Sequence, residues 1–245
     1  MSNTEQNVND DIDAAVKEAF KVLRANIKFF GQKGKVKTLT ITSTKMGEGK
    51  TTVSTNLAAA MAETGMKVLY IDADLRKAST LKHLKGETKC GLSNLLSEGT
   101  PLDEVILPTQ TENLFCIASG PKPPNPTELV GSSEFSGLLK MVSEGFDIII
   151  IDTPPLGTMI DAAVIAERTD GTIIIAGAKE TDLRSMKRVR EQLGKANVRI
   201  LGAVLNKVAK RDFESYYGYY HYNNKERTSK KGWLGKLNIL RKVSL

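Results

Sequence analysis

One stretch constrains the fold of this chain more than any other feature, the run TLTITSTKMGEGKTTVSTNLAAAMAETG over residues 38–65. Leu39 and Ile41 alternate with threonines, which predicts a β-strand, and the small residues later in the run predict a helix. Gly47 and Gly49 lie in the turn between them, where the lack of a Cβ lets backbone amides approach an anion. A strand, a glycine-containing turn and a helix in this order predict a phosphate-binding loop.

The residues after the second glycine suit a bound nucleotide. The first turn of the helix directs unpaired N–H groups and the positive end of the helix dipole at the phosphates. Lys50 is placed to reach the β- and γ-phosphate oxygens, and the hydroxyl of Thr51 is placed to ligate Mg²⁺. ATP and Mg²⁺ are therefore the expected ligands of this loop.

The loop departs from the usual pattern G-x-x-x-x-G-K-[ST] at its first position, which is Thr44 in this chain. Lys45 follows and gives the sequence KMGEGKTT. In this respect the loop resembles that of the deviant P-loop ATPases of the partition and division-site type. The resemblance implies that Lys45 reaches the phosphates of a neighbouring subunit.

Length and composition indicate one α/β domain, because 245 residues with 40% hydrophobic content can bury a full core. The chain shows neither a signal peptide nor an uncharged apolar run of about 18 residues, so we expect a cytoplasmic protein. Cys90 and Cys116 lack the spacing of metal ligands and suit a reducing compartment.

A second predicted strand ends in carboxylates. The segment VLYIDADLR predicts a buried strand from Val68 to Ile71, followed by Asp72 and Asp74. In doubly wound sheets, ligands bind at the edge where the carboxyl ends of the strands meet. One aspartate suits a Mg²⁺ site and the other suits a general base, and a turn with solvated acids is the alternative.

A third strand is apolar throughout. The segment FDIIIIDTPP predicts a strand over Ile148–Ile151 that is buried on both faces, as in a parallel sheet, and that is closed by Asp152. Asp152 is thereby expected at the same sheet edge as Thr51 and Asp72. A Walker B carboxylate at this place holds Mg²⁺ through water.

Two more buried strands are predicted, TIIIAGAKE from Thr172 and RILGAVLNKV from Arg199, on either side of a helix over residues 182–195. Asn206 ends the last strand, where its amide suits either the adenine edge or a turn. These segments together predict an α/β fold, a doubly wound and mainly parallel sheet with helices on both faces.

An amphipathic helix is predicted ahead of the first strand, starting at Asp13 after a mobile segment of residues 1–12. Its apolar stripe consists of Val16, Phe20, Leu23 and Ile27. Glu18, Lys21 and Arg24 fall on another face at a spacing of three. That face is either solvated or a contact between subunits.

Five of the six tyrosines lie close together in residues 211–224. They are Tyr216, Tyr217, Tyr219, Tyr220 and Tyr222. Gly218 and the flanking polar residues oppose a buried strand or an amphipathic helix, so an exposed and flexible segment is expected. Phenols in such a segment suit phosphate acceptors, and stacking on single-stranded nucleic acid is the alternative.

The segment 225–245 is basic. It holds seven basic residues and one acidic residue and so carries +6 of the net charge of +7. The rest of the chain is nearly neutral, and no nucleic-acid partner is expected. A helix here would place Trp233, Leu234, Leu237 and Leu240 on one face, which suits contact with an anionic membrane surface; a disordered tail is the alternative.

In their order along the chain, these features resemble the bacterial tyrosine kinases that regulate capsule and exopolysaccharide synthesis, in particular the stand-alone cytoplasmic type of Gram-positive bacteria. The resemblance runs from Glu18 to Tyr222 through EAFKVLRANI, STKMGEGKTT, VLYIDADLR, PPNPTEL, IIIIDTPP, VLNK and the tyrosine cluster. It assigns the Walker A loop to Gly47, Glu48, Gly49, Lys50, Thr51 and Thr52. It also assigns an additional acidic motif to Asp72 and Asp74, and Walker B to Asp152.

The resemblance further implies what the protein does. Residues 13–210 would form an ATP-dependent protein-tyrosine kinase domain that phosphorylates the tyrosine cluster of a neighbour within a ring of subunits. The cytoplasmic tail of a transmembrane partner would stimulate it and hold it at the membrane, and a cognate tyrosine phosphatase and other protein substrates are expected. Two features depart from the family: Lys21 stands where arginine is usual, and residues 223–245 follow the tyrosine cluster.

Phosphoryl transfer assigns a role to each candidate residue. Lys50 and Mg²⁺ would draw charge from the γ-phosphate, and Thr51 and Asp152 would hold the metal. Asp72 is the predicted general base, and Asp74 is the competing candidate and a further metal ligand. The alternative function is a partition or division-site ATPase acting as a nucleotide-switched positioning or scaffold protein, which leaves the tyrosine cluster unexplained.

Overall fold

The computed structural model describes residues 2–32, 36–77, 90–209 and 212. Two compact units make up the chain, residues 1–207 and residues 208–245, and the fold is that of the first unit. The predicted tyrosine cluster from Tyr216 to Tyr222 and the predicted basic segment 225–245 lie outside the described residues.

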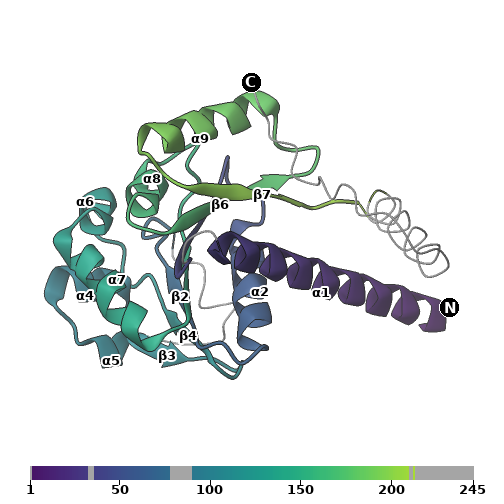
Figure 1. Ribbon diagram of the computed structural model, residues 1–245, viewed down its shortest axis with the longest axis horizontal. Coiled ribbons are helices and arrows are strands. Elements are labelled where there is room, and N and C mark those ends of the chain that lie inside the picture. Colours follow the sequence, from purple (N-terminus) through teal and green to yellow (C-terminus); the bar gives the residue numbers. More distant parts are fainter. Residues whose placement is uncertain (1, 33–35, 78–89, 210–211, 213–245) are drawn as a thin grey trace. The chain divides into compact units, whose positions relative to one another are not determined.

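In the described part of the chain, seven strands form one sheet (Figure 1). The strands are β1 (Thr38–Ser43), β2 (Val68–Asp72), β3 (Ile106–Pro108), β4 (Leu114–Ile117), β5 (Ile148–Asp152), β6 (Gly171–Gly177) and β7 (Ile200–Asn206). They lie in the order β3-β4-β2-β5-β1-β6-β7, and neighbouring strands are parallel except for the β3–β4 pair. This is the predicted α/β fold with a mainly parallel sheet.

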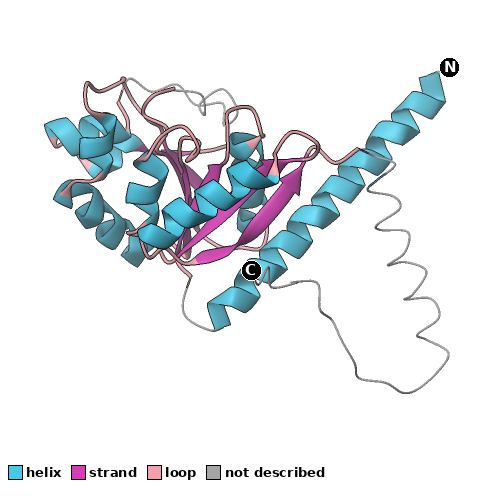
Figure 2. Cartoon of the chain, turned by 90° about the horizontal axis from the view of Figure 1, so that it is seen from above, coloured by secondary structure: helices cyan, strands magenta, loops and turns pink. Residues whose placement is uncertain are grey.

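Helices cover both faces of the sheet (Figure 2). They are α1 (Ser2–Gln32), α2 (Lys50–Ala62), α4 (Leu92–Glu98), α5 (Leu102–Val105), α6 (Pro126–Val130), α7 (Ser133–Gly145), α8 (Asp161–Ala166) and α9 (Leu183–Lys195). Helices α1 and α2 pack on one face, and α4, α6 and α7 pack on the other. None of the helices that the structure describes is both long and apolar enough to span a membrane.

The apolar run of β5 shows why the central strands carry no polar face. Ile148 and Ile150 pack into the core beneath α1 and α2, whereas Ile149 and Ile151 pack into the core beneath α4, α6 and α7. Successive side chains of a strand point to opposite faces, and both faces here are covered. The prediction that this strand is buried on both faces is confirmed.

The structure differs from the sequence prediction at one long helix and at several short elements. Helix α1 begins at Ser2 rather than at Asp13, because residues 2–12 contain neither glycine nor proline and the helix continues beyond the stripe that packs on α2. The mobility predicted for residues 1–12 stays a prediction. The short elements β3, α5, α6 and α8 were not predicted, because they span only three, four, five and six residues, too few for a clear period.

Candidate active site

The predicted phosphate loop joins β1 to α2 at the carboxyl end of the sheet. Its glycines Gly47 and Gly49 have φ angles of 85° and 84°, in the left-handed region that side chains disfavour. A Cβ on Gly49 would also lie 2.1 Å from Nδ2 of Asn206. The backbone angle therefore favours glycine at position 49, and the Asn206 side chain would have to move to admit a Cβ there.

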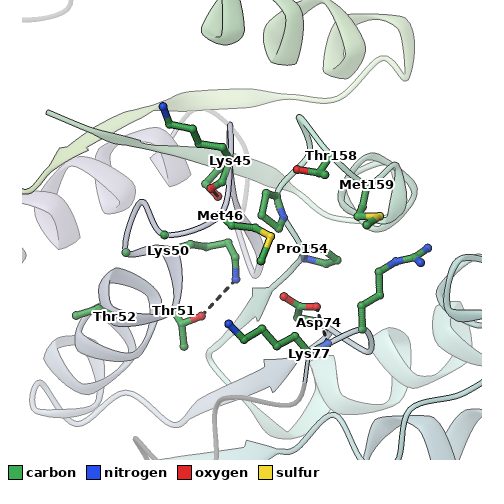
Figure 3. A pocket seen from close by; sticks show the side chains of 15 residues that line it. Lys45, Met46, Lys50, Thr51, Thr52, Asp74, Lys77, Pro154, Thr158 and Met159 are labelled. Atoms are coloured by element: carbon green, nitrogen blue, oxygen red, sulfur yellow. Dashed lines mark hydrogen bonds between the residues drawn. The ribbon is translucent and has the colours of Figure 1, made fainter. Parts of the chain in front are cut away.

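The amino end of α2 is open to a ligand. Gly49 is its N-cap residue, and no described side chain caps the helix. The N–H groups of the first turn are thus left for an anion, together with the positive end of the helix dipole. They face a cavity of about 480 Å³. The residues that line it are Ser43, Lys45, Met46, Gly47, Gly49, Lys50, Thr51, Thr52, Asp74, Arg76, Lys77, Pro154, Pro155, Thr158 and Met159 (Figure 3).

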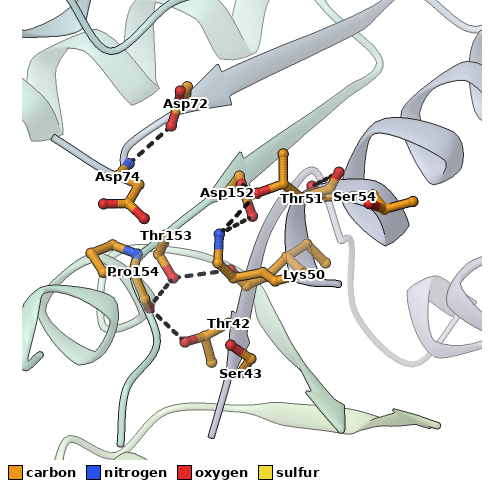
Figure 4. Close-up of polar contacts among 12 residues, drawn as sticks. Thr42, Ser43, Lys50, Thr51, Ser54, Asp72, Asp74, Asp152, Thr153 and Pro154 are labelled. Carbon is orange, nitrogen blue, oxygen red and sulfur yellow. Dashed lines mark hydrogen bonds and ion pairs between the residues drawn. The ribbon is translucent and has the colours of Figure 1, made fainter. Parts of the chain in front are cut away.

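Lys50, Thr51 and Asp152 form the polar centre of the site (Figure 4). Nζ of Lys50 lies 2.8 Å from Oδ1 of Asp152, and the hydroxyl of Thr51 donates to Oδ2 of Asp152 at 2.6 Å. The lysine and aspartate side chains are 8% and 0% exposed. These residues, 101 and 102 positions apart along the chain, meet because β1 and β5 are adjacent parallel strands. The predicted meeting of Thr51 and Asp152 at one sheet edge is confirmed.

The aspartate that ends β2, Asp72, and the aspartate two residues later, Asp74, occupy different environments. Asp72 is opposite Asp152 in the β2–β5 register, is 1% exposed, and accepts a hydrogen bond from the backbone N–H of Asp74 at 3.1 Å. Asp74 is half-buried and lines the cavity. Burial raises the pKa of the Asp74 carboxyl above its ordinary value, while the Lys50 ammonium opposes the rise and Asp152 adds to it. The structure thus brings Asp74, rather than Asp72, to the cavity wall.

The turn after Asp74 is held by side-chain hydrogen bonds and an ion pair that the sequence did not predict. Nε of Arg76 lies 2.6 Å from Oδ2 of Asp161, and a terminal guanidinium nitrogen donates to the hydroxyl of Thr127 at 2.9 Å. Thr127 also donates to Asp161. Thr127 lies within the quoted PPNPTEL segment, to which the sequence assigned no chemistry, and Asp161 opens the unpredicted helix α8. The available sequence signal was Asp161 itself, an acidic residue that follows the DTPP segment and precedes the apolar run AAVIA.

Three residues assigned to the nucleotide by sequence have protein partners here. Lys45 donates from Nζ to the backbone carbonyl of Glu180, and Figure 3 shows its side chain pointing away from Lys50. Asn206 donates from Nδ2 to the backbone carbonyl of Glu48 at 2.9 Å. The Glu48 carboxylate is turned into the protein rather than to the cavity. Their contacts with nucleotide stay predictions.

The three charged residues predicted at a subunit contact separate on α1. Glu18 and Lys21 pair with each other at 3.1 Å on the exposed surface of the helix. Arg24 instead donates to the backbone carbonyl of Ala60 in α2 at 2.7 Å, and so helps to hold α1 on α2 within one chain. The role of these residues between subunits stays a prediction.

Similarity to known proteins shows which family the chain belongs to. Residues 36–200 match the family model described as AAA domain. Over 213 residues the chain is 37% identical to the putative tyrosine-protein kinase CapB of Staphylococcus aureus, with 87% of this chain and 93% of that protein covered. The chain belongs to the bacterial tyrosine-protein kinase family. Another member, tyrosine-protein kinase CpsD of Streptococcus agalactiae, is 38% identical over 214 residues, covering 87% and 92% of the two chains.

Solved structures agree with this family assignment. The kinase domain of the Escherichia coli tyrosine kinase ETK superposes with a TM-score of 0.77 at 30% identity, covering 90% of this chain and 80% of that one. The septum site-determining protein MinD of Pyrococcus horikoshii, complexed with Mg-ADP, gives a TM-score of 0.61 at 27% identity, covering 73% and 76%. This chain therefore shares its fold with a division-site ATPase, as the resemblance of the loop implied.

The residues present fit a nucleotide with Mg²⁺. The glycine cradle, the uncapped helix terminus and Lys50 suit phosphates, and the oxygen atoms of Thr51, Asp74 and Asp152 suit a hard cation. Among the described residues, no three His, Cys, Asp or Glu side chains are grouped to hold a metal ion by themselves. Mg²⁺ commonly takes one or two carboxylates and completes its octahedron with water and substrate phosphates, which matches this set.

Proposed function

We propose that this chain is an ATP-dependent protein-tyrosine kinase that phosphorylates, in trans, the tyrosine cluster from Tyr216 to Tyr222 of another copy of itself. The observation that carries the proposal is the contact of Lys50 and Thr51 with the buried Asp152 beside an uncapped helix terminus, in a chain of the tyrosine-kinase family. Capsule or exopolysaccharide synthesis is the proposed process, since relatives named CapB and CpsD are among the proteins that resemble the chain.

Each residue of the polar centre has a role in holding ATP. Backbone amides of residues 47–52 and Nζ of Lys50 bind the phosphates, and Lys50 exchanges its Asp152 partner for phosphate oxygens when the nucleotide arrives. Thr51 and Asp152 would hold Mg²⁺, which when bound would supply neutralisation of the charge that develops on the transferred group. Lys50 supplies the same neutralisation from a side chain that is 8% exposed and therefore little screened.

The transfer itself needs a proton acceptor. The phenol oxygen attacks the γ-phosphorus, the bond from that phosphorus to the bridging oxygen breaks, ADP leaves, and the phenol proton passes to a carboxylate. A free phenol has a pKa of about 10, so an acceptor is required at neutral pH. Asp74 suits this role because it lines the cavity and its pKa is raised. Asp72 was the choice from sequence, and its carboxylate holds the Asp74 backbone.

The two aspartates are distinguished by one pair of variants. Asp74→Asn is expected to lower the labelling rate at saturating ATP by about 10²- to 10⁴-fold, with less than about threefold change in ATP affinity. It is also expected to raise the melting temperature without ligand by about 2 °C. The folded-state pKa of Asp74 lies above the unfolded value, so the ionised carboxylate opposes folding at neutral pH. This destabilisation decreases as pH falls through the folded-state pKa and is absent below the unfolded-state pKa.

The comparison variant is Asp72→Ala, measured by rapid-quench labelling and by nucleotide titration. If Asp72→Ala slows labelling more than Asp74→Asn does, with ATP affinity retained, then Asp72 is the base and the assignment to Asp74 is wrong. Equal losses of rate and affinity in either variant would make that residue chiefly a binding residue.

Further partners follow from the same proposal. The kinase acts in the cytoplasm as a homo-oligomeric ring with Glu18, Lys21 and Arg24 at the contact, and the cytoplasmic tail of a transmembrane protein activates it and keeps it at the membrane. A tyrosine phosphatase reverses the reaction, and other proteins are substrates. The basic segment 225–245 contacts the anionic membrane surface.

The test is to incubate the protein with Mg²⁺ and γ-labelled ATP, with and without the cytoplasmic tail of a candidate membrane partner, and to map the label. Phosphotyrosine within residues 216–222 is the expected result. Changing all five cluster tyrosines to Phe should remove this label while transfer to a synthetic Glu/Tyr copolymer continues, which shows that the variant is active. Free phosphate without labelled protein would instead identify a positioning ATPase of the MinD type.

A further inference from the structure

Glu48 stands inside the phosphate loop but its side chain does not face the cavity. The residue is 0% exposed, and its neighbours Gly47 and Gly49 line the cavity where Glu48 does not. One carboxylate oxygen accepts from the backbone N–H groups of Thr44 at 2.7 Å and Lys45 at 3.1 Å. The other accepts from the hydroxyls of Thr44, at 2.6 Å, and Thr181. The carboxylate thus has four donors, all from the protein.

This environment keeps the carboxylate charged and away from the phosphates. Burial by itself would raise the pKa of Glu48, but the hydrogen bonds from Thr181, Thr44 and the loop backbone outweigh it and lower the pKa below its ordinary value. A buried anion without such donors would be costly, and an anion facing the cavity would repel a polyphosphate. The arrangement therefore suits a structural acceptor rather than a ligand contact.

The same contacts account for the departure of the loop from the usual glycine pattern. Thr44, at the first glycine position, is 4% exposed, and its hydroxyl and N–H both need acceptors at this depth. Glu48 supplies both. On the opposite side a Cβ at position 157 would lie 1.9 Å from the Thr44 carbonyl oxygen, so Gly157 lets the backbone pack there. The residue types at positions 44 and 48 are thus physically linked.

Glu48 also contacts three separate segments of the site. Thr181 lies between β6 and α9, where its hydroxyl accepts from the Gly177 N–H at 2.9 Å while it donates to Glu48. At the end of β7, Asn206 donates to the Glu48 backbone carbonyl at 2.9 Å. The loops that follow β1 and β6 and the end of β7 therefore converge on this one residue, through its side chain and its carbonyl.

We propose that Glu48 is a positioning residue that holds the phosphate loop in its nucleotide-binding shape through Thr44 and Thr181, without itself touching the nucleotide. The inference rests on the proposed function in that this loop binds ATP. Loss of Glu48 therefore weakens nucleotide binding, because the free loop must be ordered when the ligand arrives. The chemical step at saturating ATP is left nearly unchanged.

The experiment is a double-mutant cycle on nucleotide affinity, with Glu48→Gln, Thr181→Val and the double variant. Calorimetric titration with MgADP gives the affinity, and labelling at saturating ATP gives the rate. Glu48→Gln is expected to weaken binding about 10- to 100-fold, since glutamine is uncharged and replaces one of the two accepting oxygens with an NH₂ donor. Thr181→Val is expected to weaken binding about fivefold, and the double variant no more than Glu48→Gln alone. The rate at saturation is expected to stay within about threefold of wild type.

Glu63→Gln is the matched control, because Glu63 is an exposed residue at the opposite end of α2. The Glu63→Gln protein should bind MgADP with the affinity of wild type. Should Glu48→Gln fail to fold, Thr181→Val alone still decides, and unchanged affinity in it overturns the proposal. A Glu48→Gln protein that binds MgADP as tightly as wild type does would also overturn the proposal. So would one whose labelling rate at saturating ATP falls as much as its affinity. A wild-type protein that binds no nucleotide would overturn the proposed function itself.

Discussion

Lys50→Met is expected to abolish tyrosine labelling, with a fall of at least about 10³-fold in rate. Methionine keeps most of the length of the side chain and removes the ammonium group, which is 2.8 Å from Asp152 in this structure and reaches the phosphates in the proposed mechanism. The measurement is phosphotyrosine formed from Mg²⁺ and γ-labelled ATP, alongside nucleotide titration. Binding should weaken as well, since a phosphate contact in the ground state is also lost.

The matched control for this experiment is Lys195→Met. Lys195 is an exposed lysine in the last turn of α9, away from the residues that line the cavity. The control should label at the wild-type rate. If Lys50→Met labelled as fast as Lys195→Met does, the phosphate loop would not be the site of transfer, and the proposed mechanism would fail.

Asp152→Asn is expected to lower the melting temperature by about 10 °C and to abolish labelling, because breaking one partner of a buried pair costs about 3–5 kcal/mol. Asparagine keeps an oxygen that accepts from Thr51 but removes the carboxylate charge that pairs with Lys50 at a position that is 8% exposed. It also removes the carboxylate proposed to hold Mg²⁺. Nucleotide binding should therefore lose most of its dependence on Mg²⁺.

The double variant Lys50→Met with Asp152→Asn separates stability from function. With both charges gone, neither half of the Lys50–Asp152 pair is left buried without its partner, and much of the lost stability should return while labelling stays absent. Thermal unfolding followed by circular dichroism, with and without MgADP, measures both effects. A double variant as unstable as Asp152→Asn would show that the loss arises elsewhere than in the unpaired Lys50.

The parts of the site that the sequence predicted correctly are set by local patterns. The turn at Gly47 and Gly49 needs left-handed backbone, which few residues other than glycine adopt, so its place can be read directly. The apolar run that ends at Asp152 can only be a strand covered on both faces, and parallel strands end at one edge. The adjacency of Thr51 and Asp152 follows from these two facts.

The parts that needed the structure depend on contacts between distant segments. Asp72 and Asp74 are equivalent in sequence, and the β2–β5 register and the turn that Arg76 anchors on Asp161 decide which of them reaches the cavity. The partners Arg76 and Asp161 are 85 positions apart, and Glu48 and Thr181 are 133 apart. No periodicity or local motif carries that information.

By itself, then, the amino-acid sequence determined the fold class, the phosphate loop and the edge of the sheet at which the acids gather, because glycine stereochemistry and the burial of apolar strands act over a few neighbouring residues. The tertiary structure alone decided where each side chain of that edge turns. Glu48 faces inward, Asn206 holds the loop, and Asp74 faces the cavity. The physical reason is that buried polar groups take the donors and acceptors that packing brings to them, wherever in the chain these lie.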